Sequence, residues 1–121
     1  IDQSHTAKEI VDKLNLPINY VIGSVEKLPF EDKQFDVVIA GEIIEHMEDP
    51  AAFVKELCRI GNKVALSTVD TKSENAIKHG DYIEHLWEFE ESDLIDFFKP
   101  FCSDVEFCYV GDYMMIYAIT K

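Results

Sequence analysis

Apolar residues recur along this chain at helical spacing in three segments. The first covers 6–14 and opens with Thr6-Ala7-Lys8-Glu9, which fits a capping box. The second begins at Pro50 and runs through AAFVKELCRI, and Gly61 follows as its stop. The third is EESDLIDFF at 90–98, which ends before a proline. The pattern therefore predicts three helices separated by other structure.

Five further segments are rich in β-branched and aromatic residues, as strands are. They are INYVIG (18–23), FDVVIAG (35–41), KVALSTV (63–69), SDVEFCYV (103–110) and DYMMIYAIT (112–120). The 35–41 run is almost continuously apolar, which predicts a strand buried on both faces. A Gly111-Asp112 turn joins the last two strands as a hairpin, and Ile1-Asp2 has the character of the tail of another strand.

Strands that alternate with helices predict an α/β fold with right-handed crossovers. We expect a Rossmann-like, mostly parallel sheet with helices on both faces and an antiparallel hairpin at its C-terminal edge. The chain has 121 residues, of which 47% are apolar and 29% charged, so one core and a single domain over 1–121 are expected.

The charge balance narrows the classes of partner. Acids outnumber bases 24 to 11, and the net charge of −13 argues against general binding to nucleic-acid phosphates. No apolar run has the length of a membrane span, and the opening IDQSHTAKE lacks the pattern of a secretory signal. Cys58, Cys102 and Cys108 form no CxxC pair, so we expect reduced, mostly buried thiols in a cytoplasmic protein.

Polar residues follow two of these strands at their carboxyl ends, where open α/β sheets bind ligands. Asp2 could accept hydrogen bonds from the two hydroxyls of a ribose, or it could cap a helix. Gly23 lets the backbone approach a flat ligand, and the amides beyond it together with Ser24 could pair with an adenine edge. The alternative is an ordinary turn with Glu26 in solvent.

The most concentrated polar cluster follows the 35–41 strand. If 42–46 forms a helical turn, Glu42, Glu45 and His46 share one face. They could bind a divalent ion, or provide a general base with its orienting partner. Alternatively His46 bonds a backbone carbonyl and the acids favour a helix start. His85, in the irregular segment 70–90, could reach the cluster as a further ligand or proton acceptor, or lie in a surface loop.

The run from Gly23 to Pro50 resembles the Rossmann-like (class I) S-adenosylmethionine-dependent methyltransferases, particularly their type 11 group. Those proteins carry a G-D-x-E-x-L-P-F-like segment, then F-D-x-V with an acid-acid-histidine ending and a following D-P. The matching residues are Gly23, Glu26, Leu28, Pro29, Phe30, Phe35, Asp36, Val38, Glu42, Glu45, His46, Asp49 and Pro50.

The resemblance implies roles for residues at the strand ends. Asp2 would hold the cofactor ribose, Ser24 and Val25 would meet the adenine, and the strand end at Ala40-Gly41 would face its methionine part. The family usually has an aspartate where this chain has Ser24, and a serine accepts hydrogen bonds without the charge. The implied reaction is methyl transfer to a small-molecule acceptor, which the sequence does not identify.

The family's first strand and its glycine-rich G-x-G-x-G turn would precede Asp2, and both are absent from this sequence. In the family that strand lies between the strand ending at Asp2 and the 35–41 strand. We therefore expect two open sheet edges, through which copies of the chain could associate. We favour an N-terminally truncated piece of a longer protein that binds S-adenosylmethionine weakly or not at all.

The acid-acid-histidine cluster also resembles ubiquinone-pathway O-methyltransferases and small-RNA 3′-end 2′-O-methyltransferases. There such residues bind a divalent metal beside the acceptor hydroxyl, which implies Glu42, Glu45, His46 and His85 as ligands here. Without a metal, His46 aided by Glu45 is the expected general base. The charge of −13 ranks a small-molecule acceptor above RNA.

Two other classes of function compete with methyl transfer. A degenerate, non-catalytic Rossmann-like domain could use the open edges for association, and the absent glycine-rich turn favours it. A dinucleotide oxidoreductase is disfavoured by Leu28-Pro29-Phe30 and by the C-terminal hairpin.

Overall fold

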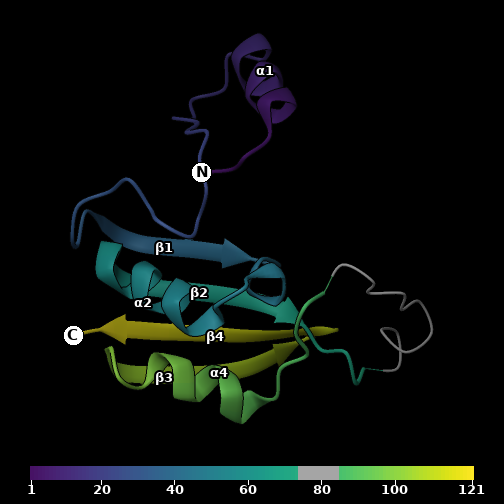
Figure 1. Cartoon of the computed structure of the whole chain (residues 1–121), viewed down its shortest axis with the longest axis vertical. Coiled ribbons are helices and arrows are strands. Elements are labelled where there is room, and N and C mark those ends of the chain that lie inside the picture. Colours follow the sequence, from purple (N-terminus) through teal and green to yellow (C-terminus); the bar gives the residue numbers. More distant parts are fainter. Residues whose placement is uncertain (74–84) are drawn as a thin grey trace.

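The computed structural model describes residues 1–73 and 85–121, which form a four-stranded sheet with helices packed on it and an arm (Figure 1). The elements are α1 (His5–Lys13), β1 (Phe35–Gly41), the 3-10 helix η1 (Ile44–His46), α2 (Pro50–Ile60), β2 (Gly61–Val69), α4 (Glu91–Phe98), β3 (Cys102–Val110) and β4 (Tyr113–Thr120). The predicted helices at 50–60 and 90–98 and the predicted strands at 35–41, 63–69, 103–110 and 112–120 are confirmed within a few residues.

The strand order of the sheet is β1-β2-β4-β3. β1 and β2 run parallel, and β2–β4 and β4–β3 run antiparallel. The turn between β3 and β4 contains Gly111 at a φ of +60°, a left-handed conformation that glycine adopts without steric cost. The α/β class and the antiparallel C-terminal hairpin are thereby confirmed, whereas the sheet of the described residues is mixed rather than mostly parallel, since only β1 and β2 run parallel.

The core lies between the sheet and the two helices α2 and α4, which contact each other on one face of the sheet (Figure 1). α2 begins with Pro50 at its first turn, and the Asp49 side chain accepts a hydrogen bond from the Ala52 N–H at 2.9 Å. Among the described residues, no helix packs against the opposite face. The most deeply buried side chains of the core include Ile44, Val54, Val64, Leu66, Leu94, Phe98 and Ile116.

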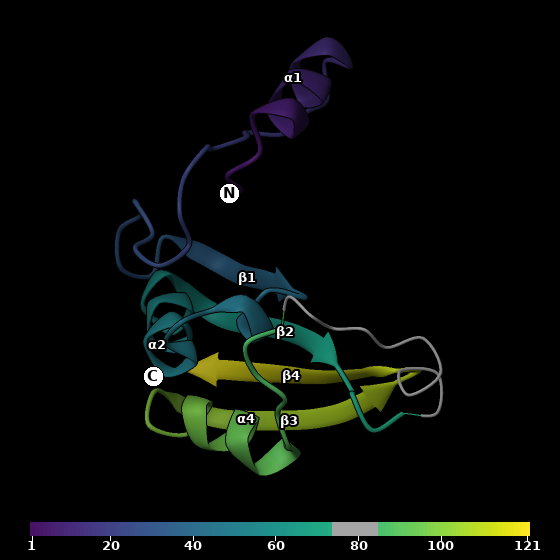
Figure 2. The ribbon, with the colours of Figure 1, turned by 45° about the vertical axis from the view of Figure 1, so that its right-hand side comes forward.

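The first 23 residues form an arm that lies apart from this core. α1 has no buried residue, and it lies away from the sheet in both ribbon views (Figures 1 and 2). Its N-cap is Ser4, whose hydroxyl accepts from the Ala7 N–H at 3.1 Å, so the predicted capping box at Thr6 is wrong. The predicted strand at 18–23 is also wrong, since that run makes only one parallel bridge, between Asp2 and Ile22.

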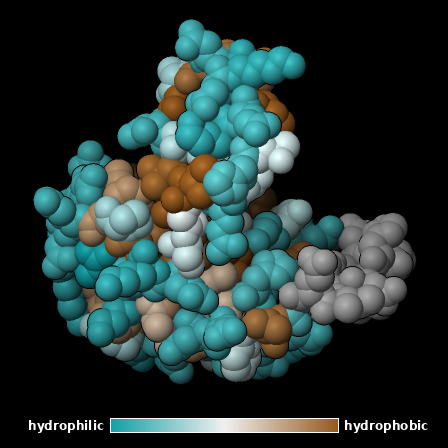
Figure 3. Space-filling view, turned by 45° about the horizontal axis from the view of Figure 1, so that its top comes forward, coloured by the Kyte–Doolittle hydropathy of each residue, from teal (hydrophilic) through white to brown (hydrophobic). Residues whose placement is uncertain are grey.

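β1 is an edge strand of the sheet, paired with β2 on one side only. Ile39 is 80% exposed and Val37 is 49% exposed, so the predicted burial of 35–41 on both faces is wrong. Val37 and Ile39 are exposed because β1 is at an open edge of the sheet, as the sequence led us to expect. The Asp2–Ile22 bridge lies outside the four-stranded sheet and does not cover this edge. Apolar surface gathers where the arm meets the sheet (Figure 3).

Candidate active site

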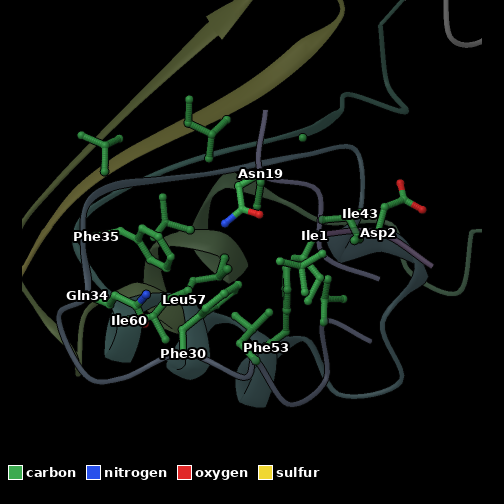
Figure 4. A pocket seen from close by; sticks show the side chains of 18 residues that line it. Ile1, Asp2, Asn19, Phe30, Gln34, Phe35, Ile43, Phe53, Leu57 and Ile60 are labelled. Atoms are coloured by element: carbon green, nitrogen blue, oxygen red, sulfur yellow. The ribbon is translucent and has the colours of Figure 1, made fainter. Parts of the chain in front are cut away.

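A cavity of about 480 Å³ lies between the arm and β1 (Figure 4). Asp2 and Ile43 lie at one end, and Gln34 and Phe35 lie at the other. The apolar face of α2 contributes Phe53, Leu57 and Ile60 to its lining. Four of the five residues predicted to meet the cofactor line this cavity: Asp2, Val25, Ala40 and Gly41.

Asp2 is held by the backbone of its neighbours. Its N–H donates to the Val21 carbonyl and its carbonyl accepts from the Gly23 N–H, both at 3.1 Å. One carboxylate oxygen, Oδ1, accepts from the Ser4 N–H at 2.8 Å. The predicted helix-capping alternative is therefore wrong, because Ser4 is the N-cap of α1 and the Asp2 carboxylate bonds the N–H of Ser4 itself. Asp2 also lines the cavity, and its carboxylate can accept further hydrogen bonds.

The turn after residue 22 places Val25 and Ser24 differently. Val25 lines a second cavity of about 240 Å³ together with Asp2, Gly23, Ile43 and Met47. A Cβ added at Gly23 would lie 3.1 Å from Ile1 Cδ1, so this backbone approaches Ile1 closely. Ser24 is exposed, lines neither cavity, and its hydroxyl accepts from the Glu26 N–H at 3.2 Å. The structure thus brings Val25 to Asp2 but not Ser24.

Glu42 does not belong to a helical turn with Glu45 and His46. Its φ is +51°, and the 3-10 helix begins two residues later, so the predicted common face at i, i+3 and i+4 is wrong. Its N–H donates to the Ser67 carbonyl at 3.0 Å, and its Oε1 accepts from the Ser67 hydroxyl at 2.8 Å. Partial burial raises the pKa of the Glu42 carboxyl, and the Ser67 hydrogen bond opposes that rise. Glu42 therefore ties the end of β1 to β2.

Glu45, His46 and His85 lie together just beyond β1. One ligand atom from each lies within 4.8 Å of the others, and the two imidazole rings meet edge to face with centroids 4.9 Å apart. Glu45 is only 2% exposed, and neither of its carboxylate oxygens has a hydrogen-bond partner among the described residues. Such a buried carboxylate is costly unless a cation or donor approaches it. The donor set, one carboxylate and two imidazoles, is one that Zn²⁺ and Mn²⁺ accept.

Two backbone-directed hydrogen bonds hold the 85–87 segment against η1. The Leu86 N–H donates to the Glu45 carbonyl at 2.8 Å, and the Trp87 indole Nε1–H donates to the Met47 carbonyl at 2.8 Å. These contacts bring His85 to the cluster, as the sequence led us to expect. The roles of Leu86 and Ser67 were not predicted from the sequence. Leu86 bonds a backbone carbonyl of η1, and Ser67 lies on β2, far from Glu42 in sequence. Most of the segment predicted as a lid falls in 74–84, outside the described residues.

One end of the cavity, at Asp2 and Ile43, lies at the same edge of the sheet as the histidine cluster. Gly41 pairs with Ser67 at the carboxyl ends of the parallel strands, and η1 follows three residues later. Ligands in open α/β sheets bind at this edge. A cavity with one carboxylate, next to a carboxylate and two imidazoles, can hold a polar ligand beside groups that accept a proton or bind a cation.

Comparison of the chain with models of protein families identifies the kind of domain. One model, described as a methyltransferase domain, matches residues 1–64, more than half of the chain. The chain belongs to this methyltransferase family. The matched part of this methyltransferase chain contains all five residues predicted for the cofactor and the cluster from Glu42 to His46, but not His85.

Sequence relatives agree with the family. The methyltransferase chain is 32% identical over 108 residues to a ubiquinone biosynthesis O-methyltransferase of Pelagibacter ubique, covering 77% of this chain and 45% of that protein. It is 27% identical over 100 residues to the protein of the same description from Coxiella burnetii, covering 78% of this chain and 43% of that protein. The chain therefore spans less than half the length of these two relatives.

Solved structures share the fold. A Thermotoga maritima structure, described as an S-adenosylmethionine-dependent methyltransferase and possible histamine N-methyltransferase, matches with a TM-score of 0.78 at 19% identity. The match covers 98% of this chain and 71% of that one. The Rossmann-like methyltransferase fold is thereby confirmed. Within the described part of the chain, no helix has the length and apolar character that a membrane crossing requires.

Proposed function

We propose that this chain forms part of an S-adenosylmethionine-dependent methyltransferase that methylates a small-molecule acceptor, with a hydroxyl as the acceptor group. The observation that carries the proposal is the meeting of Asp2, Ala40 and Gly41 in one cavity, beside the cluster of Glu45, His46 and His85. The similarity to the ubiquinone biosynthesis O-methyltransferases of Pelagibacter ubique and Coxiella burnetii favours an oxygen acceptor.

The cavity fits the chemistry of the cofactor. The Asp2 carboxylate would accept hydrogen bonds from the ribose hydroxyls, and Val25 would lie against the adenine. The strand end at Ala40 and Gly41 would face the methionine part. The Ser24 hydroxyl accepts from the Glu26 N–H and keeps its O–H donor and a second lone pair for the adenine edge. S-adenosylmethionine supplies an electrophilic methyl group on a sulfonium centre.

The chain's own residues would orient the acceptor and accept its proton. Where no cation is bound, we assign the general base to the His46 imidazole, with the buried Glu45 carboxylate next to it to favour the imidazolium that forms. His85, edge to face with His46, would limit the positions that the His46 ring adopts. Most of the rate gain in such a transfer comes from holding donor and acceptor in line.

A divalent cation is a finer proposal at the same cluster. The unpartnered, buried Glu45 carboxylate beside two imidazoles fits a metal, with Glu45, His46 and His85 as its ligands. Glu42, bonded to Ser67, is assigned to the metal only as an outer partner. A bound cation would lower the pKa of an acceptor hydroxyl. The same cluster is compatible with an RNA 2′-hydroxyl, but the charge of −13 favours a small molecule.

Thermal shift tests the metal in the full-length protein. We expect Mn²⁺ or Zn²⁺ to raise the melting temperature. If S-adenosylmethionine raises it while Mg²⁺, Mn²⁺ and Zn²⁺ do not, the metal assignment is wrong and the base assignment to His46 remains.

A His46→Ala variant of the full-length enzyme tests the base. General-base catalysis contributes about 10²–10⁴-fold, so turnover should fall by at least about tenfold. The matched control is His5→Ala, because His5 is exposed on α1, apart from the cluster. A smaller loss in the His46 variant, or an equal loss in both variants, would contradict the assignment.

We further propose that these 121 residues alone bind the cofactor weakly, because the open side of β1 leaves the cavity without one wall. Calorimetric titration with S-adenosylmethionine should give little or no heat, and NAD serves as a control for the oxidoreductase class. A dissociation constant in the micromolar range would show that the open cavity is sufficient.

An association domain without catalysis is the second candidate, and the exposed edge of β1 favours it. Ile39 at 80% exposure and Val37 at 49% leave an apolar strand ready to pair. Mass measurement by size-exclusion chromatography combined with the calorimetric titration separates the candidates. A full-length protein that self-associates and binds no cofactor would favour association over methyl transfer.

A further inference from the structure

Two cysteines that are far apart in sequence meet in the core. Cys58 and Cys102 are separated by 44 positions, yet their Sγ atoms lie 3.7 Å apart. Cys58 is 4% exposed and Cys102 is 7% exposed. The pair lies at the end of the sheet opposite the cluster of Glu45, His46 and His85, since Cys102 pairs with Thr120 and Gly41 lies at the other end of β1. Methyl transfer, as proposed above, does not use it.

The backbone on each side allows the sulfurs to move closer. A disulfide bond is about 2.05 Å long, so the two sulfurs must approach by about 1.7 Å. Cys58 lies in the last turn of α2, and Cys102 is the first residue of β3. The register of β3 against β4 shifts between Cys102 and Asp104, so the start of that strand is not held by a regular ladder. We therefore expect side-chain rotation with a small backbone shift to close the gap.

One cysteine of the pair, Cys58, lines a surface cavity near cations, and Cys102 lies behind it in the core. A surface cavity of about 370 Å³ is lined by Cys58 together with Lys33 and Lys121. Lys33 Nζ also donates to the Cys58 carbonyl at 3.0 Å. Burial raises the pKa of both thiols, that of Cys58 to about 12, while Lys33 and Lys121 oppose the rise at Cys102. The two lysines therefore favour the Cys102 thiolate against its burial.

We propose that Cys58 and Cys102 are a redox-modification site, which a peroxide converts to an intramolecular disulfide that ties α2 to β3. The Cys102 thiolate attacks one peroxide oxygen, the O–O bond breaks, and the departing hydroxide takes a proton to give water and a sulfenic acid. The Cys58 sulfur then attacks the Cys102 sulfur, the S–O bond breaks, and the Cys58 proton leaves with the hydroxide as a second water. Two thiols are oxidised and one peroxide is reduced.

The test exposes the native chain to hydrogen peroxide and follows it by intact mass and non-reducing peptide mapping. We expect the loss of two hydrogens and a peptide pair joined through Cys58 and Cys102. The cross-link closes a long loop, so the oxidised chain should melt about 5 °C or more higher, and dithiothreitol should reverse the shift.

Cys108→Ser is the matched control, because Cys108 is exposed and should form no part of the cross-link. This variant should oxidise like the wild type, whereas Cys58→Ala should form no intramolecular disulfide. The wild-type peptide map alone decides the question if Cys58→Ala does not fold. Oxidation confined to Cys108, sulfinic acid at Cys58 or Cys102 without a cross-link, or a cross-link that forms only after unfolding would each overturn the proposal.

Discussion

The N–H of Leu86 donates to the carbonyl oxygen of Glu45 at 2.8 Å, which joins the segment after residue 84 to the 3-10 helix after β1. The hydrogen bond from the Trp87 indole to the Met47 carbonyl lies next to it. Together these two contacts fix the position of His85 beside His46. The cluster therefore depends on a segment that is distant in sequence and held through backbone acceptors.

Trp87→Phe should loosen this segment. The phenyl ring keeps most of the apolar contact with Phe89, but it cannot donate to the Met47 carbonyl. Losing one such partly exposed hydrogen bond costs about 0.5–1 kcal/mol. Hydrogen exchange of the Leu86 amide should accelerate several-fold. Tyr117→Phe on β4 is the control and should leave that amide unchanged. Equal exchange in the wild type and Trp87→Phe would show that the indole bond does not hold the segment.

Glu45→Gln should leave the metal-free chain at least as stable as the wild type. The carboxylate is 2% exposed without a hydrogen-bond partner among the described residues, so removing its formal charge relieves a desolvation cost of about 1 kcal/mol or more. Any rise in melting temperature caused by Mn²⁺ or Zn²⁺ should disappear in this variant. Glu48→Gln, two residues from η1 and exposed, is the control. A strong destabilisation of Glu45→Gln without metal would indicate a protein partner for the carboxylate.

The interaction of Arg59 with Glu56 should make the free energy of unfolding depend on pH. Its guanidinium bonds both carboxylate oxygens of Glu56 and the carbonyls of Leu28 and Phe30. The hydrogen bonds from Arg59 hold the pKa of the Glu56 carboxyl below its ordinary value of 4.5, although burial opposes them. A lowered folded pKa contributes stability above the unfolded pKa, and that contribution is lost as pH falls through the folded pKa. The wild type should therefore lose stability below about pH 4.5.

The Arg59→Met variant tests this dependence by chemical denaturation at pH 7 and pH 3. At pH 7 it should be less stable than the wild type, because the Glu56 carboxylate and two carbonyls lose their donor. The difference from the wild type should shrink at pH 3. Glu106→Gln, an exposed change on β3, should follow the wild type at both values. A difference that is independent of pH would mean that the packing of the Arg59 chain dominates.

Sequence reasoning recovered what is set by local periodicity. The apolar period of 50–60 and the β-branched run at 63–69 each contain enough information to place α2 and β2. Prediction from the sequence failed where the structure of a segment depends on whether a strand pairs with it. The run at 18–23 has strand composition but forms only one bridge, because no strand of the described residues lies between it and β1.

The same limit applies to the candidate site. Asp2, Val25, Ala40 and Gly41 were found because strand ends in parallel sheets converge. The left-handed backbone of Glu42 could not be found, since nothing in the residue type predicts a φ of +51°. Contacts such as that of Leu86 with Glu45 depend on chain folding over a long distance.

Gly61→Ala should be the most damaging single methyl group in the fold. A Cβ at this position would lie 2.7 Å from Val38 Cγ2 and 3.0 Å from the Lys63 carbonyl oxygen. Neither atom moves easily, because Val38 is stiff and the other is backbone, so we expect a loss of about 1–3 kcal/mol. Gly41→Ala, whose Cβ would lie 3.5 Å from Ser67 Oγ, should cost less. Urea unfolding of both variants measures the difference, and equal losses would contradict the close packing of β1 on β2.

Ile39→Lys should suppress association through the open edge of β1. Ile39 is 80% exposed, so the change should alter the free energy of unfolding by less than about 0.5 kcal/mol. A lysine at an edge strand opposes pairing with another strand, because its charge would have to be buried. Light scattering over a range of concentrations should show less association than in the wild type.

Tyr109→Lys is the matched control for Ile39→Lys. Tyr109 is 56% exposed on β3, the opposite edge of the same sheet. If both edges associate equally, both lysines should reduce association to the same extent. We expect Ile39→Lys to reduce association more than Tyr109→Lys, because β1 also borders the apolar cavity and the exposed Ile1 and Val37. A partner strand would cover these groups. A larger effect of Tyr109→Lys than of Ile39→Lys would assign the association surface to β3 and leave the β1 edge without a partner role.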